Sequence, residues 1–555
     1  MTTIESEPPV GDETTRPPLS DAQLGRLRAY GTPQTVEAGD VLYGPGDPSY
    51  DLIVVDDAVL DIVQPATSDG PEETIVRYDS GAFLGELNML TGQTVYLIAR
   101  AAEGGRIHRI PPGRFRQLMA EDSELGNIIV EAFRARREYL THSGASRGIE
   151  LVGNSIDAGS LALRRYAARS RLPHLWFDSD SVAGQALMET TALTIADLPA
   201  AVIRGRVLRR TTPSKLAEAL GLTYRRDASK SVDLTIVGAG PAGLAAAVYG
   251  ASEGLAIVLL DAVGPGGQAA SSSRIENYLG FPSGISGSEL AERAETQALK
   301  FGARLSSPCE VVSLAMDEQL RAVLADGTDI PTRALIIATG ARYRSLDLER
   351  WDDFLGTGIF YAATEIEARS CADGPVTVVG GGNGAGQAAL FLAANGCDVT
   401  VAIRGPEIET GMSQYLVDRL RANPKVTIHS GTQVARLRGR QALDSISLVG
   451  PGGWQHEQAC CGLFCFIGAD PATSWLTGVA LDERGFVRTD VQLAADELGE
   501  TWTALGRGPL PFETNVPGVF AVGDVRRGSM KRVASAVGEG ASAVRSVHTA
   551  IGVRA

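Results

Sequence analysis

The segment Leu234-Thr-Ile-Val-Gly238-Ala-Gly240-Pro241-Ala242-Gly243 is an apolar run that enters a cluster of glycines. This pattern predicts a buried strand, a tight turn and a helix that begins near Pro241. The first glycine permits the turn, the second lets the backbone approach a pyrophosphate, and the third lets helix and strand pack closely. The next apolar run, 256–260, ends in Asp261, where a ribose hydroxyl needs an acceptor. The segment therefore predicts a dinucleotide site on a doubly wound α/β sheet.

A second segment, Val376-Thr-Val-Val-Gly380-Gly-Gly382-Asn383-Gly384-Ala385-Gly386, repeats the strand–turn–helix plan. Its second strand, 398–403, is followed by Arg404 and not by an acid. An acid there would hold the ribose of NAD, so Arg404 favours the 2′-phosphate of NADPH, and NADH stays possible. The alternative is a solvated arginine at a strand end. Two such segments predict two Rossmann-like domains in one chain.

Length and composition limit the remaining choices. A chain of 555 residues is too long for one core, and 44% hydrophobic with 21% charged residues is typical of globular proteins. The net charge of −15 disfavours nucleic acid as a partner. We expect no membrane segment, because no apolar run approaches the roughly 18 residues that one needs. Residues 1–19 are polar and proline-rich and lack an export signal, so they predict a disordered tail on a cytoplasmic protein.

Two smaller regions precede the glycine segments. Short β-branched runs between residues 20 and 110 predict an antiparallel β domain, and helical spacing follows over 115–140. A small α/β module comes next, with strands predicted at 149–152, 175–177 and 199–204 and helices at 160–171 and 214–220.

Four motifs in order resemble those of the low-molecular-weight thioredoxin reductases, a class II type of pyridine nucleotide-disulfide oxidoreductase. They are Gly264-Pro-Gly-Gly267-Gln268 with Ile275-Glu-Asn277-Tyr-Leu-Gly-Phe-Pro282, Ile337-Ala-Thr339-Gly340, Pro517-Gly-Val-Phe-Ala-Val-Gly523-Asp524, and Arg532-Val533-Ala534. The resemblance implies that FAD binds at Gly238–Gly243 and along these motifs, with Asp524 on the ribitol chain and Arg532–Ala534 facing the isoalloxazine. It also implies a homodimer.

The resemblance fails at one place. The family carries its redox-active pair in a Tyr-Cys-Ala-Thr-Cys run, and the matching run here is Tyr361-Ala362-Ala363-Thr364-Glu365. This loss resembles the cysteine-less branch of the family, which includes ferredoxin–NADP reductases, and it leaves ferredoxin, flavodoxin, a quinone or oxygen as acceptors. Glu365 is a candidate proton carrier near the flavin, or else a solvated or capping carboxylate.

A disulfide scaffold is not expected, and four of the six cysteines are interpreted as packed thiols. We expect Cys371 to have no near partner and to lie in a core. Cys460, Cys461 and Cys465 surround an apolar strand, and no histidine stands close enough to complete a usual metal site, so we predict no metal.

The β domain resembles cyclic-nucleotide-binding domains, which are β jelly-rolls. The resemblance rests on residues 36–47 and on the loop Phe83-Leu-Gly85-Glu86-Leu87-Asn-Met-Leu90. In that family Gly-Glu-Leu binds the cyclic phosphate and ribose, and a later arginine neutralises the phosphate. Val95 and Tyr96 occupy the arginine positions here, and Arg100 comes too late. The domain therefore either binds cyclic nucleotide weakly or keeps the fold for contacts.

The small module resembles a thioredoxin or glutaredoxin fold in the order of its elements. Pro199 falls where that family has a cis-proline, and the loop 153–159 contains no cysteine, which favours a docking or spacing role. The predicted domains are a tail over 1–19, a jelly-roll over 20–145, the small module over 148–228, an FAD-binding domain over 231–350 and 471–555, and an NAD(P)-binding domain over 351–470.

Three functions stay open at this point. The first is an NADPH-dependent FAD enzyme that reduces a small electron carrier or small molecule. The second is a sensor that responds to cyclic nucleotide or redox state. The third is a thioredoxin-disulfide reductase that uses non-standard cysteines, of which Cys371 is the candidate.

Overall fold

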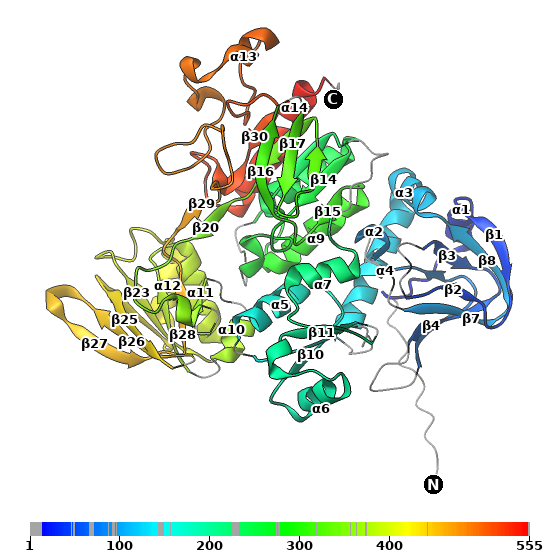
Figure 1. The fold of residues 1–555 in the computed structure, drawn as a ribbon, viewed down its shortest axis with the longest axis horizontal. Coiled ribbons are helices and arrows are strands. Elements are labelled where there is room, and N and C mark those ends of the chain that lie inside the picture. The colour runs from blue at the N-terminus through cyan, green and yellow to red at the C-terminus, as the bar shows by residue number, and fades with distance from the viewer. Residues whose placement is uncertain are drawn as a thin grey trace. The chain divides into compact units, whose positions relative to one another are not determined.

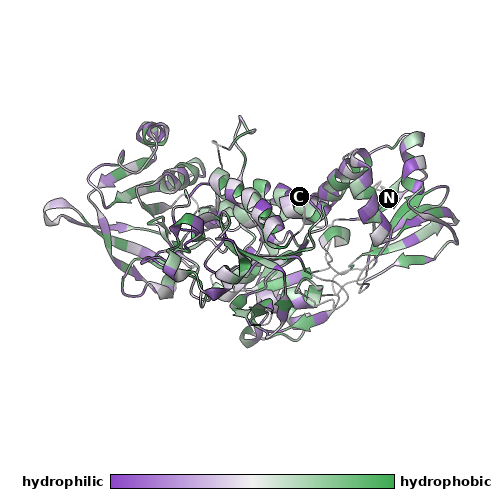
Figure 2. Ribbon diagram, turned by 90° about the horizontal axis from the view of Figure 1, so that it is seen from above, coloured by the Kyte–Doolittle hydropathy of each residue, from purple (hydrophilic) through white to green (hydrophobic). Residues whose placement is uncertain are grey.

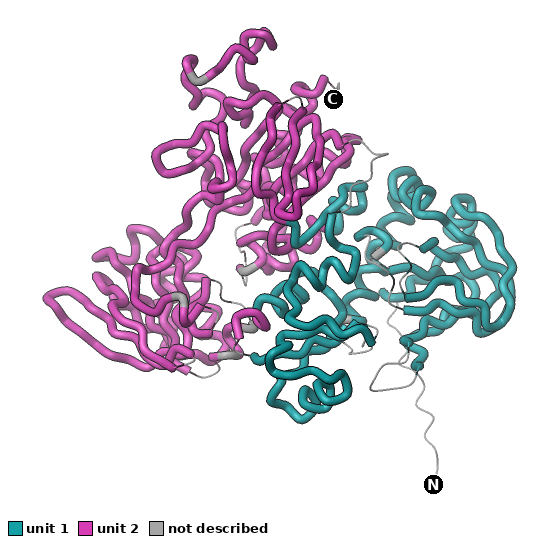
Figure 3. The backbone as a smooth tube through the Cα atoms, in the orientation of Figure 1, with its two compact units in different colours: residues 1–155, 162–225, 296–309 teal, residues 156–161, 226–295, 310–555 magenta. Residues whose placement is uncertain are grey.

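Figure 1 shows the chain in a computed structural model, with its helices and strands labelled where there is room. The structure describes all residues except 1–13, 46, 48–49, 66–71, 87, 92–94, 96, 143–148, 156, 204, 225–231, 273–274, 276–277, 318, 356, 362, 364, 372–373, 441 and 553–555. The chain divides into two compact units, teal and magenta in Figure 3. Unit 1 spans Met1–Ser155, Ala162–Arg225 and Thr296–Cys309, and unit 2 spans Ile156–Leu161, Arg226–Glu295 and Glu310–Ala555. Within the described residues, no helix is both long and apolar enough to cross a membrane.

The first part of unit 1 is a sandwich of two antiparallel sheets, which confirms the predicted β domain. Its strands are β1 (Thr32–Val36), β2 (Val41–Tyr43), β3 (Leu52–Val55), β4 (Val59–Gln64), β5 (Glu73–Tyr78), β6 (Phe83–Leu84), β7 (Ile98–Glu103) and β8 (Gly105–Ile110). One sheet has the order β1-β8-β3-β6 and the other β2-β7-β4-β5. Side chains from both sheets, such as Ile53, Leu60 and Ile107, share one core.

Four helices accompany the sandwich: α1 (Asp21–Arg28), α2 (Asn88–Thr91), α3 (Pro112–Glu121) and α4 (Ser123–His142). The prediction of one helix over 115–140 is wrong at Asp122, where the backbone leaves helical geometry at φ −119° and ψ 88°. The Asp122 carboxylate accepts a hydrogen bond of 3.1 Å from the Leu125 N–H, so this residue caps the second helix.

The small α/β module has the predicted order of elements plus two that the sequence did not reveal. They are β9 (Ile149–Gly153), α5 (Ala158–Arg169), β10 (Leu175–Asp178), α6 (Val182–Thr190), β11 (Ala200–Ile203), β12 (Arg206–Leu208) and α7 (Pro213–Leu220). The sheet order is β10-β9-β11-β12, with β10 parallel to β9 and β11 antiparallel to it. The Leu198–Pro199 bond is cis, at the position where a cis-proline was predicted.

The first doubly wound sheet lies in unit 2. Its elements are β13 (Leu234–Val237), α8 (Pro241–Ser252), β14 (Ile257–Leu260), β19 (Ala334–Ile337), β30 (Val519–Ala521) and α14 (Val533–Ala550). Within the unit the parallel strands lie in the order β14-β13-β19-β30, so the carboxyl-terminal segment returns to the first sheet as predicted. Figure 2 shows hydrophilic and hydrophobic residues side by side along the helices, as expected where one helix face packs on a sheet.

The remaining elements between these strands along the chain are α9 (Gly287–Lys300), β15 (Arg304–Ser306), β16 (Val311–Met316), β17 (Leu320–Leu324), β18 (Asp329–Pro331) and α13 (Glu500–Leu505). The strands β16, β17 and β18 form an antiparallel sheet of their own.

The second doubly wound sheet confirms the repeat predicted from the sequence. Its elements are β21 (Ile359–Phe360), α10 (Glu365–Ser370), β22 (Pro375–Val379), α11 (Asn383–Ala394), β23 (Asp398–Ile403), α12 (Gln414–Ala422), β24 (Val426–Ser430) and β28 (Gly462–Cys465). Its order is β21-β28-β22-β23-β24, all parallel. The chain enters along β20 (Ala341–Tyr343) and leaves along β29 (Ala469–Pro471), which pair antiparallel. An antiparallel sheet of β25 (Gln433–Gly439), β26 (Leu443–Val449) and β27 (Gln455–Ala459) completes this part.

Candidate functional site

The first glycine turn has the geometry that its sequence predicts. Gly238 has φ +108°, and a Cβ there would lie 2.3 Å from the Ala338 carbonyl oxygen. A Cβ on Gly243 would lie 1.8 Å from the Gly238 carbonyl oxygen, so α8 rests directly on the turn. Gly240 caps α8 without a side-chain hydrogen bond, and its nearest neighbour is the Gly267 Cα at 3.9 Å from a Cβ position. The backbone N–H groups at the start of α8 are therefore left for a ligand.

Asp261 follows β14 and reaches back to the turn. Its Oδ2 accepts a hydrogen bond of 2.8 Å from the Ala239 N–H, and its Oδ1 accepts one of 2.8 Å from the Gly264 N–H. Gly267 has φ +54°, and a Cβ there would lie 2.9 Å from the Gly240 Cα. The loop from Gly264 to Gln268 thus lies against the first glycine turn.

The next predicted residues, Gln268 and Thr339, form hydrogen bonds at β20 and just after β29, the two paired strands that connect the doubly wound sheets. Gln268 donates a side-chain hydrogen bond to the Ala341 carbonyl, and the Thr339 hydroxyl donates one of 2.9 Å to the Ala472 carbonyl. Gly340 has φ +66° and open space at its Cβ position. Asn277, also predicted to bind the flavin, lies outside the described residues.

Gly523 and Asp524 lie just after β30, at the start of a short 3₁₀ turn. The Gly523 N–H donates 2.7 Å to Glu539 of α14, and Glu539 is held by two hydrogen bonds of 3.1 and 2.8 Å from Arg526. Burial raises the pKa of the Asp524 carboxyl, Lys531 opposes this, and the Glu539 charge adds to it. The Glu539–Arg526 pair was not predicted, because it lies outside every motif.

The start of α14 agrees with the last flavin motif. Arg532 is the N-cap residue, and Val533 and Ala534 form the first turn. A Cβ on Gly540 would lie 2.1 Å from the Ala242 carbonyl oxygen, so α14 packs tightly against α8. This contact places Ala242 against α14 about two turns beyond Val533 and Ala534.

The second glycine turn repeats the first in detail. Gly380 has φ +142°, and a Cβ there would lie 2.3 Å from the Phe466 carbonyl oxygen. Gly382 caps α11 without a side-chain hydrogen bond. A Cβ on Gly386 would lie 2.7 Å from Met412 Sδ. This turn also leaves helix N–H groups for a ligand.

The other predicted residues of this turn have distinct surroundings. Asn383 exchanges two hydrogen bonds of 2.9 and 2.7 Å with Ser413, a residue that the sequence did not single out. Ala385 is buried, and Gly384 lies beside the Phe466 ring, 3.6 Å from its Cδ1 at a Cβ position. Arg404 is exposed and directly follows β23, the parallel neighbour of β22, so it lies at the same carboxyl edge of the sheet as Gly380.

The run that replaces the family's dithiol is only partly described. The Tyr361 ring stacks on Tyr343 with centroids 5.4 Å apart, and its hydroxyl accepts 3.2 Å from Trp351 Nε1. Ala362 and Thr364 lie outside the described residues, as does the side chain of Glu365, which begins α10. The role predicted for Glu365 stays a prediction.

One prediction about the cysteines is wrong. Cys371 is buried as expected, but the Cys461 thiol forms a hydrogen bond with it, so Cys371 has a near partner. The sequence did not reveal this contact, because Cys371 lies before β22 and Cys461 lies before β28. These two strands are neighbours in the sheet but far apart along the chain. Cys460 and Cys465 are buried, and burial raises the pKa of each thiol to about 12.

In the β domain, Glu86 and Gly85 are held by neighbouring arginines of α4. Glu86 is 9% exposed, and its carboxylate accepts two hydrogen bonds from Arg137, one of them 2.6 Å long. Val95, at the position of the family's arginine, is buried in the sandwich core. Arg100 pairs with Glu72 at 2.5 and 3.0 Å on the surface and so does not replace that arginine. Leu87 lies outside the described residues.

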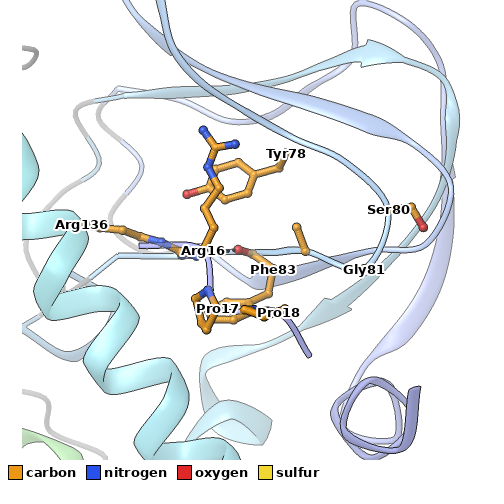
Figure 4. Close-up of a pocket in the computed structure, with 9 residues that line it drawn as sticks. Arg16, Pro17, Pro18, Tyr78, Ser80, Gly81, Phe83 and Arg136 are labelled. Carbon is orange, nitrogen blue, oxygen red and sulfur yellow. Dashed lines mark hydrogen bonds between the residues drawn. The ribbon is translucent and has the colours of Figure 1, made fainter. Parts of the chain in front are cut away.

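A small cavity of about 150 Å³ opens beside this loop, between the segment 16–18, residues 78–83 and α4 (Figure 4). The guanidinium groups of Arg16 and Arg136 lie 5.3 and 5.2 Å from the Tyr78 ring centroid. Arg136 also donates to the carbonyls of Phe83 and Gly85 at 3.0 and 2.7 Å. The cavity is smaller than the roughly 300 Å³ at which pockets for drug-sized ligands begin.

Comparison with known families shows to which family this fold belongs. The family described as pyridine nucleotide-disulphide oxidoreductase matches residues 232–540, which is more than half of the chain. The chain belongs to the pyridine nucleotide-disulphide oxidoreductase family. The cyclic nucleotide-binding domain family matches residues 33–122, so this oxidoreductase carries such a domain at its amino-terminal side.

Several proteins similar to this oxidoreductase are thioredoxin reductases. It is 32% identical to the thioredoxin reductase of Treponema pallidum over 57% of this chain and 95% of that protein. It is 33% identical to that of Streptomyces clavuligerus over 56% of this chain and 91% of that protein. The solved thioredoxin reductase of Lactococcus lactis matches with a TM-score of 0.52 and 27% identity, covering 58% of this chain and 99% of that one. The chain is therefore an FAD-dependent oxidoreductase of the thioredoxin reductase family.

The two glycine turns fit the two dinucleotides that this family uses. At both turns the backbone tolerates no side chain at the first glycine, and the helix that follows has no side-chain cap. An anionic pyrophosphate is suited to the N–H groups left at each helix start.

Proposed function

We propose that this oxidoreductase takes electrons from NADPH through bound FAD and passes them to an acceptor other than a protein dithiol. The observation that carries the proposal is that residues 361–365 contain no cysteine, although both glycine segments are complete. Without a thiolate in that run, exchange with a thioredoxin disulfide has no nucleophile. A reduced nicotinamide and a flavin, when bound, supply hydride transfer followed by electron delivery.

The first turn would hold the FAD pyrophosphate, with Asp261 near the ribose and Asp524 near the ribitol chain. Asp261 already accepts hydrogen bonds of 2.8 Å from Ala239 and Gly264, so its carboxylate is fixed in place beside the turn. Raising the pKa of Asp524 by burial favours the form that donates as well as accepts a hydrogen bond. Both residues would therefore orient the cofactor.

The second turn would hold NADPH, and Arg404 would bind its 2′-phosphate. An exposed guanidinium at the carboxyl edge of β22 and β23 favours a second phosphate group over a bare ribose. Replacement of Arg404 therefore tests the cofactor preference without touching the pyrophosphate turn.

The decisive experiment combines an anaerobic titration with an acceptor screen. FAD-loaded protein is titrated with NADPH, and the loss of flavin absorbance is recorded. The reduced protein is then mixed separately with ferredoxin, flavodoxin, a quinone, oxygen and oxidised thioredoxin. The proposal expects bleaching by NADPH and reoxidation by one of the first four. Efficient reduction of thioredoxin would overturn it.

A second candidate function is regulation through the cyclic nucleotide-binding domain. Its loop keeps Gly85 and Glu86, but Glu86 is held by Arg137 and Val95 stands in the place of the phosphate-binding arginine. The loss of one charge-assisted hydrogen bond weakens binding by roughly 1.5–3 kcal/mol, so we expect weak binding at best. Thermal unfolding and NADPH oxidation with cyclic AMP or cyclic GMP test this. No response to either ligand would assign the domain to contacts alone.

A further inference from the structure

Three cysteines that are distant in sequence meet at one turn of the second doubly wound sheet. Cys397 Sγ lies 3.6 Å and Cys461 Sγ 3.9 Å from the carbonyl oxygen of Cys371. Cys371 directly follows α10, Cys397 precedes β23 and Cys461 precedes β28. All three are present as free cysteines.

The sulfurs of Cys371 and Cys461 occupy space that two glycines leave open. A Cβ on Gly462 would lie 2.7 Å from Cys371 Sγ, and a Cβ on Gly374 would lie 2.6 Å from Cys461 Sγ. Since the two thiols also share a hydrogen bond, the sulfurs face each other. Side-chain rotation closes such a pair to a disulfide of about 2.05 Å when the backbone already brings the residues together.

The two thiols differ in access and in acidity. Cys371 is 3% exposed, whereas Cys461 is partly exposed. The hydrogen bond from Cys371 lowers the pKa of the Cys461 thiol to about 7, although partial burial opposes this. Cys461 is therefore the thiol that an external reagent meets first and in its reactive form. Cys371 is placed to attack second.

This pair lies away from the nucleotide turn of its own sheet. The Cys461 sulfur lies 3.3 Å from the carbonyl oxygen of Pro375, the first residue of β22, whereas Gly380 follows the last residue of that strand. A strand of this length spans roughly 15 Å at about 3.3 Å per residue. Oxidation of the thiols is thus separable from binding of the dinucleotide.

We propose that Cys371 and Cys461 form a thiol–disulfide exchange site whose substrate is a small aliphatic disulfide. The Cys461 thiolate attacks one sulfur of the substrate, forms a mixed disulfide and releases the other half as a thiolate, which takes up a proton. The Cys371 thiol then loses its proton and attacks Cys461 Sγ, which releases the second half as a thiol. The two cysteines end as a disulfide, and the substrate ends as two thiols.

The test uses the full-length, FAD-loaded protein with oxidised glutathione as the substrate. After incubation and blocking with N-ethylmaleimide, non-reducing peptide mapping by mass spectrometry identifies the cross-linked peptides. We expect a Cys371–Cys461 peptide that disappears on reduction. Cys309→Ser, which changes a partly exposed cysteine outside the turn, is the matched control and leaves this peptide unchanged.

Two variants separate the roles of the thiols. Cys371→Ser blocks the second step, so the Cys461–glutathione adduct rises by about tenfold or more over that of the unchanged protein. Cys461→Ser abolishes both adduct and cross-link. An unmodified Cys461, or a Cys371–Cys397 cross-link in its place, overturns the proposal. Because the first result is read on the unchanged protein, a variant that fails to fold does not rescue it.

Discussion

The substitution Gly380→Ala tests whether the second turn holds the nicotinamide cofactor. The new Cβ would lie 2.3 Å from the Phe466 carbonyl oxygen, whereas carbon and oxygen normally stay about 3.3 Å apart, so the turn must move by about 1 Å. A left-handed backbone adds about 1–2 kcal/mol of strain for alanine. A displacement of about 1 Å at a reacting site costs on the order of 100-fold in rate. We expect NADPH-driven flavin reduction to fall by about that factor.

The assay is stopped-flow reduction of the FAD-loaded protein, with FAD content measured beside it. Gly452→Ala is the matched control, because Gly452 also has a positive φ, +73°, but a Cβ there meets nothing within 4 Å. The Gly452→Ala protein should lose stability to the backbone strain but keep the flavin reduction rate of the unchanged protein. If Gly380→Ala binds FAD normally and is reduced at the unchanged rate, the second turn is not the nicotinamide site.

Three further results follow from the same structure. Arg404→Gln should raise the KM for NADPH by about tenfold and leave that for NADH unchanged, because an exposed charge-assisted contact is worth about 1.5 kcal/mol; equal effects on both would refute the 2′-phosphate role. Arg137→Met should lower the free energy of unfolding of the β domain by about 3–5 kcal/mol, because it leaves the buried Glu86 carboxylate without its ion-pair partner. Arg100→Met, which breaks the exposed pair with Glu72, should lower it by under about 1 kcal/mol. Urea titration of both variants measures the difference. Alkylation of Cys461 should be half-maximal near pH 7, and Cys371→Ala should move that midpoint up toward about 8.5, since the thiolate loses its hydrogen-bond donor; an unmoved midpoint would contradict the contact.

The parts of the site that lie within one strand–turn–helix unit were predictable from the sequence. Gly238, Gly243 and Gly380 were predicted because a glycine fingerprint reports a local steric need, and the structure places backbone oxygens against each missing Cβ. Asp261 was predicted for the same reason, since the next strand of the unit ends there.

Contacts between distant segments were not predictable in this way. Glu539 holds the Gly523 N–H from α14, and Ser413 holds Asn383 from the end of a loop, but neither belongs to a motif. The Asp122 break between α3 and α4 was missed because apolar periodicity continues across it, and only the capping role of the carboxylate marks it. Such pairs depend on register and packing, which a single sequence does not reveal.

The thiol pair also bears on whether the protein can act as a thioredoxin-disulfide reductase with displaced cysteines. The run 361–365 ends where α10 begins, whereas Cys371 follows the last residue of that helix. A helix of this length extends about 9 Å, so Cys371 lies about that far from the position of the family's dithiol. It is also buried, and its only close thiol partners in the described chain, Cys397 and Cys461, lie at the same turn.

A large protein substrate therefore cannot meet the Cys371 sulfur, while a small disulfide can meet Cys461. If Cys371 carried electrons onward from the flavin, Cys371→Ser would abolish turnover with every acceptor. The proposed separation of the two sites predicts instead that this variant keeps its NADPH-driven flavin reduction and its reaction with the acceptor, and loses only the intramolecular disulfide. A steady-state acceptor assay on Cys371→Ser, beside peptide mapping of the same sample, distinguishes the two cases in one experiment.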